Sequence, residues 1–149
     1  LGLGDCVKVC TFDAIWLDQH GLPQVIPEKC TSCGDCVEVC PKGLFSLQPV
    51  SNHLWVACKN LADPEIAQAD CEVACTACGK CVADAAPNLI RLKDNLAVVD
   101  YTRNESAAID AIQRCPTGAI VWLDDARGPI KGQAAKKIVR QQPLPIASV

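Results

Sequence analysis

Methionine is absent from the sequence, and aromatic residues are scarce: the 149 residues include two Phe, one Tyr and three Trp. A chain of this length can bury one ordinary core or split into two very small domains, and so few large rings leave either poorly filled. We therefore expect small units whose interiors depend on something other than aromatic packing. Because the chain has no Met and starts at Leu1, we also expect that a preceding segment is missing.

Sequence features of several functional classes are absent as well. No apolar run approaches the roughly 18 residues that a membrane-spanning helix needs, and the best runs are as short as Ala119 to Leu123. The sequence has no Gly-rich dinucleotide loop and no pairing of nucleophile with base, so we expect no substrate-converting site of its own. The net charge of -3 argues against a nucleic-acid partner and favours redox partners that carry basic docking patches.

Cysteine, by contrast, is abundant, with 12 residues in the chain. So many cysteines indicate the disulfides of a secreted scaffold, zinc sites or iron-sulfur clusters. Closely repeated C-x2-C-x2-C runs argue against disulfides, because such near neighbours cannot easily pair with one another. The spacing of the cysteines must then distinguish zinc from clusters.

The clearest motif extends from Cys30 to Pro41 and has the spacing C-x2-C-x2-C-x3-C-P. This is the ligand run of bacterial four-iron ferredoxins, whereas structural zinc prefers two separated C-x2-C pairs. Gly34 lets the loop turn closely around a cluster, and Pro41 ends the helical stretch after the fourth cysteine. The motif therefore predicts an iron-sulfur protein that moves single electrons.

The upstream pair Cys6 and Cys10 has the same C-x3-C spacing as the end of this run. In two-cluster ferredoxins the fourth cysteine of each run binds the neighbouring cluster, so Cys10 should complete the cluster of Cys30, Cys33 and Cys36. Cys6 and Cys40 would then share another cluster that needs two more thiolates. Position 3 is Leu, so we expect these two ligands upstream of Leu1.

The second half of the chain repeats this arrangement in reduced form. One complete ligand set is predicted on Cys75, Cys78, Cys81 and Cys115. The four slots of a second cluster hold residues without thiols, namely Ala85, Glu105, Ala108 and Ala111. We therefore expect two complete four-iron clusters in the chain, and a third that needs upstream ligands.

In place of the lost cluster, we expect an ordinary helix over residues 102–114. Thr102 and Glu105 have the spacing of a capping box, and Ile109 and Ile112 are available to fill the vacated site. The remaining cysteines, Cys58 and Cys71, are most simply small buried apolar residues. If residue 71 is helical, however, its side chain faces the cluster four residues before Cys75 and could act as an alternative ligand or a redox-active thiol.

Short strands and turns alternate with the cysteine runs. Residues 14–17 with 23–26, and 89–92 with 96–100, predict two hairpins, the second closed by a turn at Asp94 and Asn95. The sequence thus predicts an α+β fold with two tandem ferredoxin-like domains, 1–48 and 71–124. A bridging segment, 49–70, should hold a strand over 53–58 and a helix that begins near Asp63 and Pro64.

Residues 125–149 are expected to form a basic tail. The segment carries Lys131, Lys136, Lys137 and Arg140, and its charge sign is opposite to that of the body. Such a tail is either solvated or docked on an acidic neighbour or a lipid surface. His20 and His53 are interpreted as a turn residue and a surface residue.

Several of these motifs together resemble the B subunit of the Rnf electron transport complex. The resemblance covers about residues 1–125, and the paired Cys58 and Cys71 between two ferredoxin units are its most specific part. It departs from the family in the lost cluster, because family members with two C-terminal ferredoxin units usually keep both clusters in the second. The segments that carry it are residues 1–6, 12–15 and 21–23, Cys30 to Pro41, Cys58, Cys71 to Cys81, 95–97 and 115–120.

The resemblance implies a membrane-bound complex that couples electron flow between reduced ferredoxin and NAD to Na+ or proton transport. The B subunit would receive the electrons, with the other subunits of the complex as partners, at the cytoplasmic face of the membrane. A membrane-anchoring helix and two ligand cysteines would lie in the upstream segment. Two alternatives stay open: a polyferredoxin-like adaptor of a soluble hydrogenase or dehydrogenase, and an iron-sulfur redox sensor.

Overall fold

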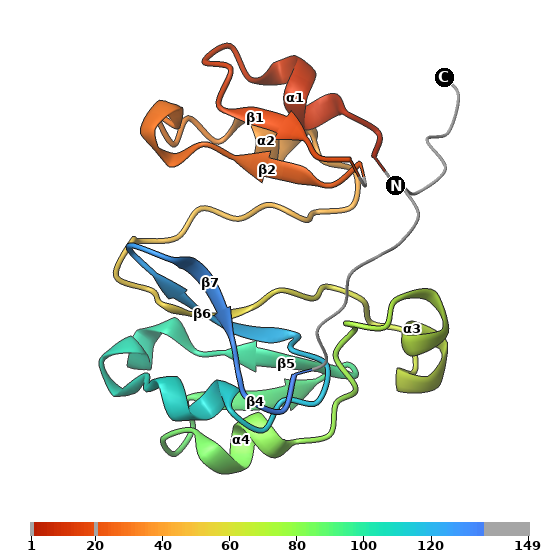
Figure 1. Ribbon diagram of the computed structural model, residues 1–149, viewed down its shortest axis with the longest axis vertical. Helices are drawn as coiled ribbons and strands as arrows, with labels where there is room; N and C mark the ends of the chain where they lie inside the picture. The colour runs from red at the N-terminus through yellow and green to blue at the C-terminus, as the bar shows by residue number, and fades with distance from the viewer. Residues whose placement is uncertain (1, 20, 136–149) are drawn as a thin grey trace. The chain divides into compact units, whose positions relative to one another are not determined.

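The computed structural model describes residues 2–19 and 21–135, which form two compact units (Figure 1). The described part of the first unit ends at Gln48, and the second unit begins at Pro49. Both units mix short helices with short antiparallel strands, as the α+β prediction requires. In the described ranges, no helix is long and apolar enough to cross a membrane.

The first unit consists of two short helices and one hairpin. Helix α1 (Asp5–Val9) contacts helix α2 (Asp35–Val39), and strands β1 (Ile15–Leu17) and β2 (Pro23–Val25) pair antiparallel, followed by the 3-10 turn η1 (Pro27–Lys29). The predicted hairpin is therefore confirmed, one residue shorter in each strand. Each helix ends at a cysteine in extended conformation, Cys10 after α1 and Cys40 after α2.

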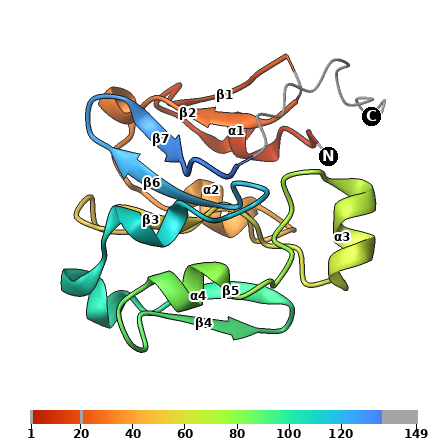
Figure 2. The ribbon, with the colours of Figure 1, turned by 60° about the horizontal axis from the view of Figure 1, so that its bottom comes forward.

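The second unit holds a three-stranded sheet and a hairpin. Strand β3 (Leu54–Val56) pairs with β6 (Ile120–Asp124), which pairs with β7 (Gly128–Lys131), and β4 (Ile90–Lys93) pairs with β5 (Leu96–Val99). Helix α4 (Lys80–Asp84) lies over this hairpin, as Figure 2 shows. The core of the second unit centres on four fully buried side chains, Leu54, Leu89, Ile112 and Ile120.

The β4–β5 turn lies at Asp94 and Asn95 as predicted, although the strands run over 90–93 and 96–99 rather than 89–92 and 96–100. Asp94 and Asn95 both have positive φ angles, 49° and 62°, which suit the right-handed twist of the flanking strands. Asp and Asn tolerate this left-handed conformation better than most residues, because their short polar side chains bond locally. The same register brings Ala97 opposite Leu92.

The segment expected to bridge the two domains, 49–70, belongs instead to the second unit. Strand β3 within it pairs with β6, and Leu54 is completely buried. The predicted helix runs as α3 (Pro64–Asp70) with Pro at its start, but the Asp63 side chain makes no capping hydrogen bond. Cys71 is the extended residue after α3 and not part of a helix, so the helical geometry expected to turn it toward the cluster is wrong.

The beginning of the predicted tail is also structured. Residues 128–131 form β7, and Ala134 N–H donates to the Gln113 carbonyl at 3.0 Å. At Gly132 any Cβ would lie well inside contact distance of the Ile112 carbonyl, so this close backbone approach requires glycine. Lys136, Lys137, Arg140 and the rest of the tail from residue 136 lie outside the described residues, as does His20.

The prediction of a single helix over 102–114 is wrong. Two 3-10 turns take its place, η2 (Tyr101–Ser106) and η3 (Ile109–Ile112), separated by an extended Ala108. The capping residue is Asp100 rather than Thr102, because the Asp100 carboxylate accepts from both the backbone N–H and the hydroxyl of Thr102. The hydroxyl expected to cap the helix is thus occupied by the preceding carboxylate.

The two isoleucines expected to fill the vacated cluster site behave differently. Ile112 is completely buried in the core, whereas Ile109 is 40% exposed. Ala111, in one of the predicted empty ligand slots, is buried beside Ile112, so the apolar packing expected from this segment involves the end of η3 and not Ile109. Nearby, the Arg114 guanidinium donates from Nε to the Asp84 carboxylate at 2.7 Å and links this segment to α4.

Substituting each isoleucine by alanine tests this asymmetry. Ile112→Ala should lower the free energy of unfolding of the second unit by about 2 to 5 kcal/mol, because it leaves a cavity in a closed core. Ile109→Ala is the matched control and should cost less than about 1 kcal/mol, because much of its side chain is already in water. Chemical denaturation of the two variants measures the difference, and equal losses would contradict the packing described.

Candidate iron-sulfur sites

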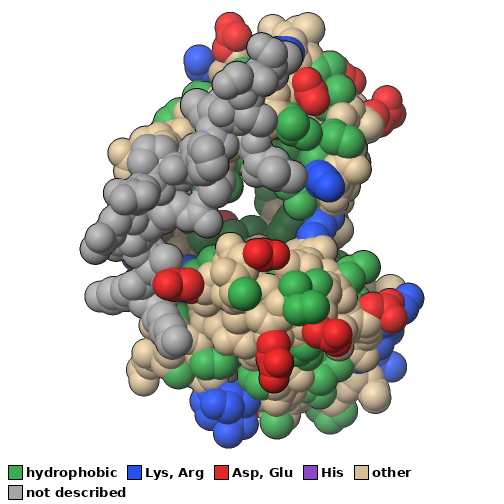
Figure 3. Space-filling model, turned by 90° about the vertical axis from the view of Figure 1, so that its right-hand side faces the viewer, with side chains coloured by type: hydrophobic (Ala, Val, Ile, Leu, Met, Phe, Trp, Pro, Cys, Tyr) green, Lys and Arg blue, Asp and Glu red, His purple; other side chains and the backbone are tan. Residues whose placement is uncertain are grey.

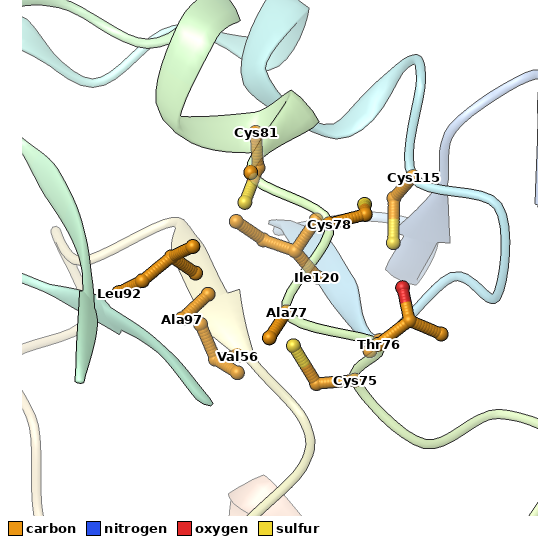
Figure 4. Close-up of a pocket in the computed structure, with 12 residues that line it drawn as sticks. Val56, Cys75, Thr76, Ala77, Cys78, Cys81, Leu92, Ala97, Cys115 and Ile120 are labelled. Atoms are coloured by element: carbon orange, nitrogen blue, oxygen red, sulfur yellow. The ribbon is translucent and has the colours of Figure 1, made fainter. Parts of the chain in front are cut away.

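Four cysteines of the second unit surround one pocket (Figure 4). Cys75 and Cys78 come from the loop before α4, Cys81 from α4 itself, and Cys115 from the segment after η3. The pocket has about 340 Å³ of space free of protein atoms, including space open to solvent. Its other walls are mostly apolar, formed by Val56, Leu92, Ala97, Ala119 and Ile120.

The thiols in this pocket influence one another. Burial raises the pKa of the Cys81 thiol to about 11, and repulsion from the ionised forms of Cys75, Cys115 and Cys78 adds to the rise. Four thiolates that converge in apolar surroundings are unfavourable unless a cationic group lies between them. A bound metal group reverses this balance and keeps coordinating thiols deprotonated.

These residues fit a four-iron cluster. The donor set is four thiolates, which is the ligand set of such clusters, and the apolar walls suit a group that is kept from water. No three His, Cys, Asp or Glu side chains within residues 2–19 and 21–135 converge closely enough to hold a single metal ion. In a cluster each thiolate binds a different iron atom, so the ligands stand further apart than around one ion.

The ligand loops of the two units share one backbone conformation. In the first unit Ser32 and Gly34 have positive φ angles of 58° and 93°, and in the second Ala77 and Gly79 have 50° and 75°. Each glycine directly precedes the helix that carries the third cysteine of its run. The left-handed positions flank the middle cysteine of each run and curl the loop around a common centre.

In the first unit, the structure brings Cys10 to the first three cysteines of the long run. Burial raises the pKa of the Cys36 thiol, and repulsion from Cys30, Cys33 and Cys10 adds to the rise. Cys30 and Cys33 are exposed, so this set reaches the protein surface. The four side chains are the set that the exchange rule predicts, although their binding to one cluster stays a prediction.

Cys6 and Cys40 also lie near one another. Burial is the main cause of the raised pKa of the Cys6 thiol, and repulsion from Cys40 adds to it. Backbone amides approach the sulfurs of the two cysteines that end the helices: Ala14 N–H donates to Cys10 Sγ at 3.4 Å, and Leu44 N–H donates to Cys40 Sγ at 3.5 Å. Such N–H···S contacts stabilise a thiolate ligand.

The four residues in the vacated slots do not form a site. Ala111 is buried and Ala85 half-buried, whereas Glu105 and Ala108 are exposed. None of them can supply a thiolate, and the backbone between residues 101 and 112 folds as two 3-10 turns rather than around a common centre. The expected loss of a cluster from this half agrees with their chemistry and stays a prediction.

Cys58 has a contact that the sequence did not predict. Its Sγ accepts a hydrogen bond from the backbone N–H of Cys75 at 3.4 Å, and the side chain packs against the core of the second unit. Cys58 lies two residues after Val56, a wall of the pocket, but this proximity becomes visible only in the structure. Cys58 therefore supports the loop that carries Cys75.

Comparison with known proteins identifies relatives of the chain. Residues 2–44 match the profile of the 4Fe-4S dicluster domain. Over 80% of its length the chain is 42% identical to the B subunit of the Na(+)-translocating ferredoxin:NAD(+) oxidoreductase complex of Acetobacterium woodii, of which it covers 36%. It is 37% identical to the B subunit of the Proton-translocating ferredoxin:NAD(+) oxidoreductase complex of Clostridium ljungdahlii, again over 80% of the chain and 43% of the relative.

A third relative is the B subunit of the Ion-translocating oxidoreductase complex of Methanosarcina acetivorans, 34% identical over 80% of the chain and 45% of the relative. The chain thus spans less than half the length of each of these three proteins. The aligned part contains a 4Fe-4S ferredoxin-type domain. The predicted resemblance to B subunits of ion-translocating complexes is confirmed at the level of sequence.

Two alanine variants test the ligand exchange in the first unit. Cys10→Ala should abolish the cluster of Cys30, Cys33 and Cys36, lowering the iron content by about four atoms per chain, because one of its four ligands is lost. Cys40→Ala is the matched control and should leave that cluster in place. Iron analysis and electron paramagnetic resonance (EPR) spectra of the reduced proteins show which variant has lost the cluster of Cys30. Loss of that cluster in Cys40→Ala but not in Cys10→Ala would contradict the grouping.

Proposed function

We propose that this chain, a homologue of the B subunits of Rnf-type ion-translocating oxidoreductases, is an iron-sulfur subunit that relays single electrons within such a complex. The observation that carries the proposal is the convergence of four cysteine side chains on one mostly apolar pocket in the second unit. The sequence relatives support the assignment to this type of complex, since three of them are B subunits of ion-translocating oxidoreductases.

Each proposed site is a set of four thiolates. Cys75, Cys78, Cys81 and Cys115 would hold one cluster in the second unit, and Cys10, Cys30, Cys33 and Cys36 would hold one in the first. A bound four-iron cluster supplies a centre that gains and loses one electron at a time. Cys6 and Cys40 would hold a further cluster together with two thiolates from outside these 149 residues, and the dicluster-domain match over residues 2–44 supports a second cluster in this unit.

The protein surroundings have separate tasks in this function. The apolar side chains of Val56, Leu92, Ala97 and Ile120 limit the access of water to the second-unit site, which favours electron transfer over side reactions. Cys30, Cys33 and Cys78 are exposed, so an electron can cross to a partner at these edges without moving the protein. No proton or other group has to move with the electron.

The partners are proposed from chemistry and from relatives. The electron donor is a low-potential carrier of the reduced ferredoxin class, and the acceptor is another subunit of the complex, at the cytoplasmic face of the membrane. Acidic side chains are exposed on and beside α3, including Asp63, Glu65, Asp70 and Glu72. On the face of the second unit in Figure 3, acidic groups lie among apolar ones across the middle, while Lys and Arg groups lie at the lower edge and the right side. The middle of this face suits docking on a basic patch.

A cysteine variant of the intact complex tests the proposal. Cys75→Ser should lower the iron and acid-labile sulfide of the chain by about four atoms each and reduce electron transfer from reduced ferredoxin through the complex to background, because the relay in the second unit is lost. Cys71→Ser is the control and should keep both, since Cys71 is outside the ligand sets. An unchanged transfer rate in Cys75→Ser would mean that this unit is not on the electron path.

A further inference from the structure

Thr117 is one of the few buried polar residues of the second unit, with 4% of its surface exposed. It lies two residues after Cys115, and its Oγ1 is 3.9 Å from Cys115 Sγ, within hydrogen-bond reach of a sulfur. A buried hydroxyl needs a partner, because leaving it unsatisfied costs the free energy of its lost hydration. The partner of this hydroxyl is the sulfur of a predicted cluster ligand.

The chain that follows Thr117 is fixed by contacts with the central sheet. Gly118 has a positive φ of 68°, and a Cβ there would lie 2.7 Å from Lys131 Cδ of β7. Beyond it, Ile120 pairs with Val56 of β3, and Ala57 N–H donates to the Ala119 carbonyl at 2.7 Å. The sheet therefore fixes the backbone that follows Thr117, whose buried hydroxyl lies beside Cys115 Sγ.

Coordination would fix the direction of the hydrogen bond. Between a free thiol and a hydroxyl, either atom can donate the proton. A cysteine that binds iron is a thiolate and has no proton to give, so the Thr117 hydroxyl must donate to Cys115 Sγ. Hydrogen bonds with an ionised acceptor are about twice as strong as neutral ones, and low-dielectric surroundings strengthen them further.

The equivalent cysteines of the first unit have another kind of partner. Cys10 and Cys40 accept from backbone amides four residues later, those of Ala14 and Leu44. Two residues after these cysteines stand Phe12 and Lys42, neither of which carries a hydroxyl. A backbone donor is present whatever the side chain, whereas the contact at Cys115 depends on Thr117 alone.

We propose that Thr117 is a positioning residue that raises the reduction potential of the second-unit cluster by donating its hydroxyl proton in a hydrogen bond to Cys115 Sγ. This inference rests on the proposed function. Reduction by one electron makes the cluster and its thiolates more negative, so a donor to the sulfur stabilises the reduced form more than the oxidised form. The residue thus adjusts the second-unit relay independently of the clusters in the first unit.

Three variants of the full chain separate the hydroxyl from the methyl group of Thr117. Thr117→Val keeps the shape and loses the hydroxyl, Thr117→Ser keeps the hydroxyl and loses the methyl, and Thr117→Ala loses both. The measurement is a redox titration of the cluster-loaded protein with dithionite as the one-electron donor, followed by EPR. The first-unit signals serve as an internal reference, since Cys10 and Cys40 have their own donors.

In the Thr117→Val and Thr117→Ala variants, the equilibrium constant for reducing the second-unit cluster should fall roughly tenfold, which lowers its midpoint potential by about 59 mV. In Thr117→Ser the potential should stay near the parent value. If Ser and Ala shift the potential and Val does not, the methyl group acts through packing and the inference is wrong. Equal potentials in all four proteins also overturn it. If the parent chain has no reducible second-unit cluster, the proposed function itself is wrong. If Thr117→Val fails to fold, the comparison of Thr117→Ala with Thr117→Ser still tests the inference.

Discussion

The convergence of thiols in confined, partly apolar surroundings is the constraint on which both units depend. Each thiol that ionises loses hydration and meets the charge of its neighbours, as the raised pKa values of Cys36 and Cys81 indicate. Without a cationic group between them, such thiols keep their protons, because ionising them together would place unpaired charges in poorly hydrated surroundings. With iron bound, the same sulfurs become cross-links between a loop, a helix and a distant turn, which is how a chain with so few aromatic residues can hold two small units together.

The second unit packs apolar side chains near the four positions at which we predict that a cluster was lost. Around the vacated slots, Ala111 and Ile112 are buried in the core, and Arg114 bonds Asp84 across to α4. The guanidinium holds the pKa of the Asp84 carboxyl below its usual value through this hydrogen bond. The Arg114 side chain is 57% exposed, so solvent screening weakens the ion pair, and packing of Ile112 is the stronger contribution to the link. Because we predict one complete ligand set in this unit, the proposed electron path through it has a single relay.

The two hairpins were predictable because they depend on local turns and short-range periodicity. Cysteine spacing led to the proposed ligand sets, which remain predictions. Long-range contacts were not predictable in this way. Strand β3 pairs with β6, which is distant in the chain, and β7 extends that sheet through a local hairpin with β6. The hydrogen bond between His53 and the Leu123 carbonyl likewise spans 70 residues, so a tail and a bridge were expected where the structure has a sheet. The two 3-10 turns replaced the expected helix because Asp100 competes for Thr102. Nothing in the sequence singled out Thr117, and its role is proposed from its burial and its contact with Cys115 in the structure.

The most direct test of the account is an experimental structure of the iron-loaded chain with iron positions taken from anomalous scattering. The account predicts one four-iron group bound by Cys10, Cys30, Cys33 and Cys36, and another bound by Cys75, Cys78, Cys81 and Cys115. It also predicts no iron beside Ala85 and Ala111. Iron bound by Cys30 and Cys40 together, or a second iron group in the second unit, would contradict the ligand exchange and the loss of a cluster on which the proposed relay depends.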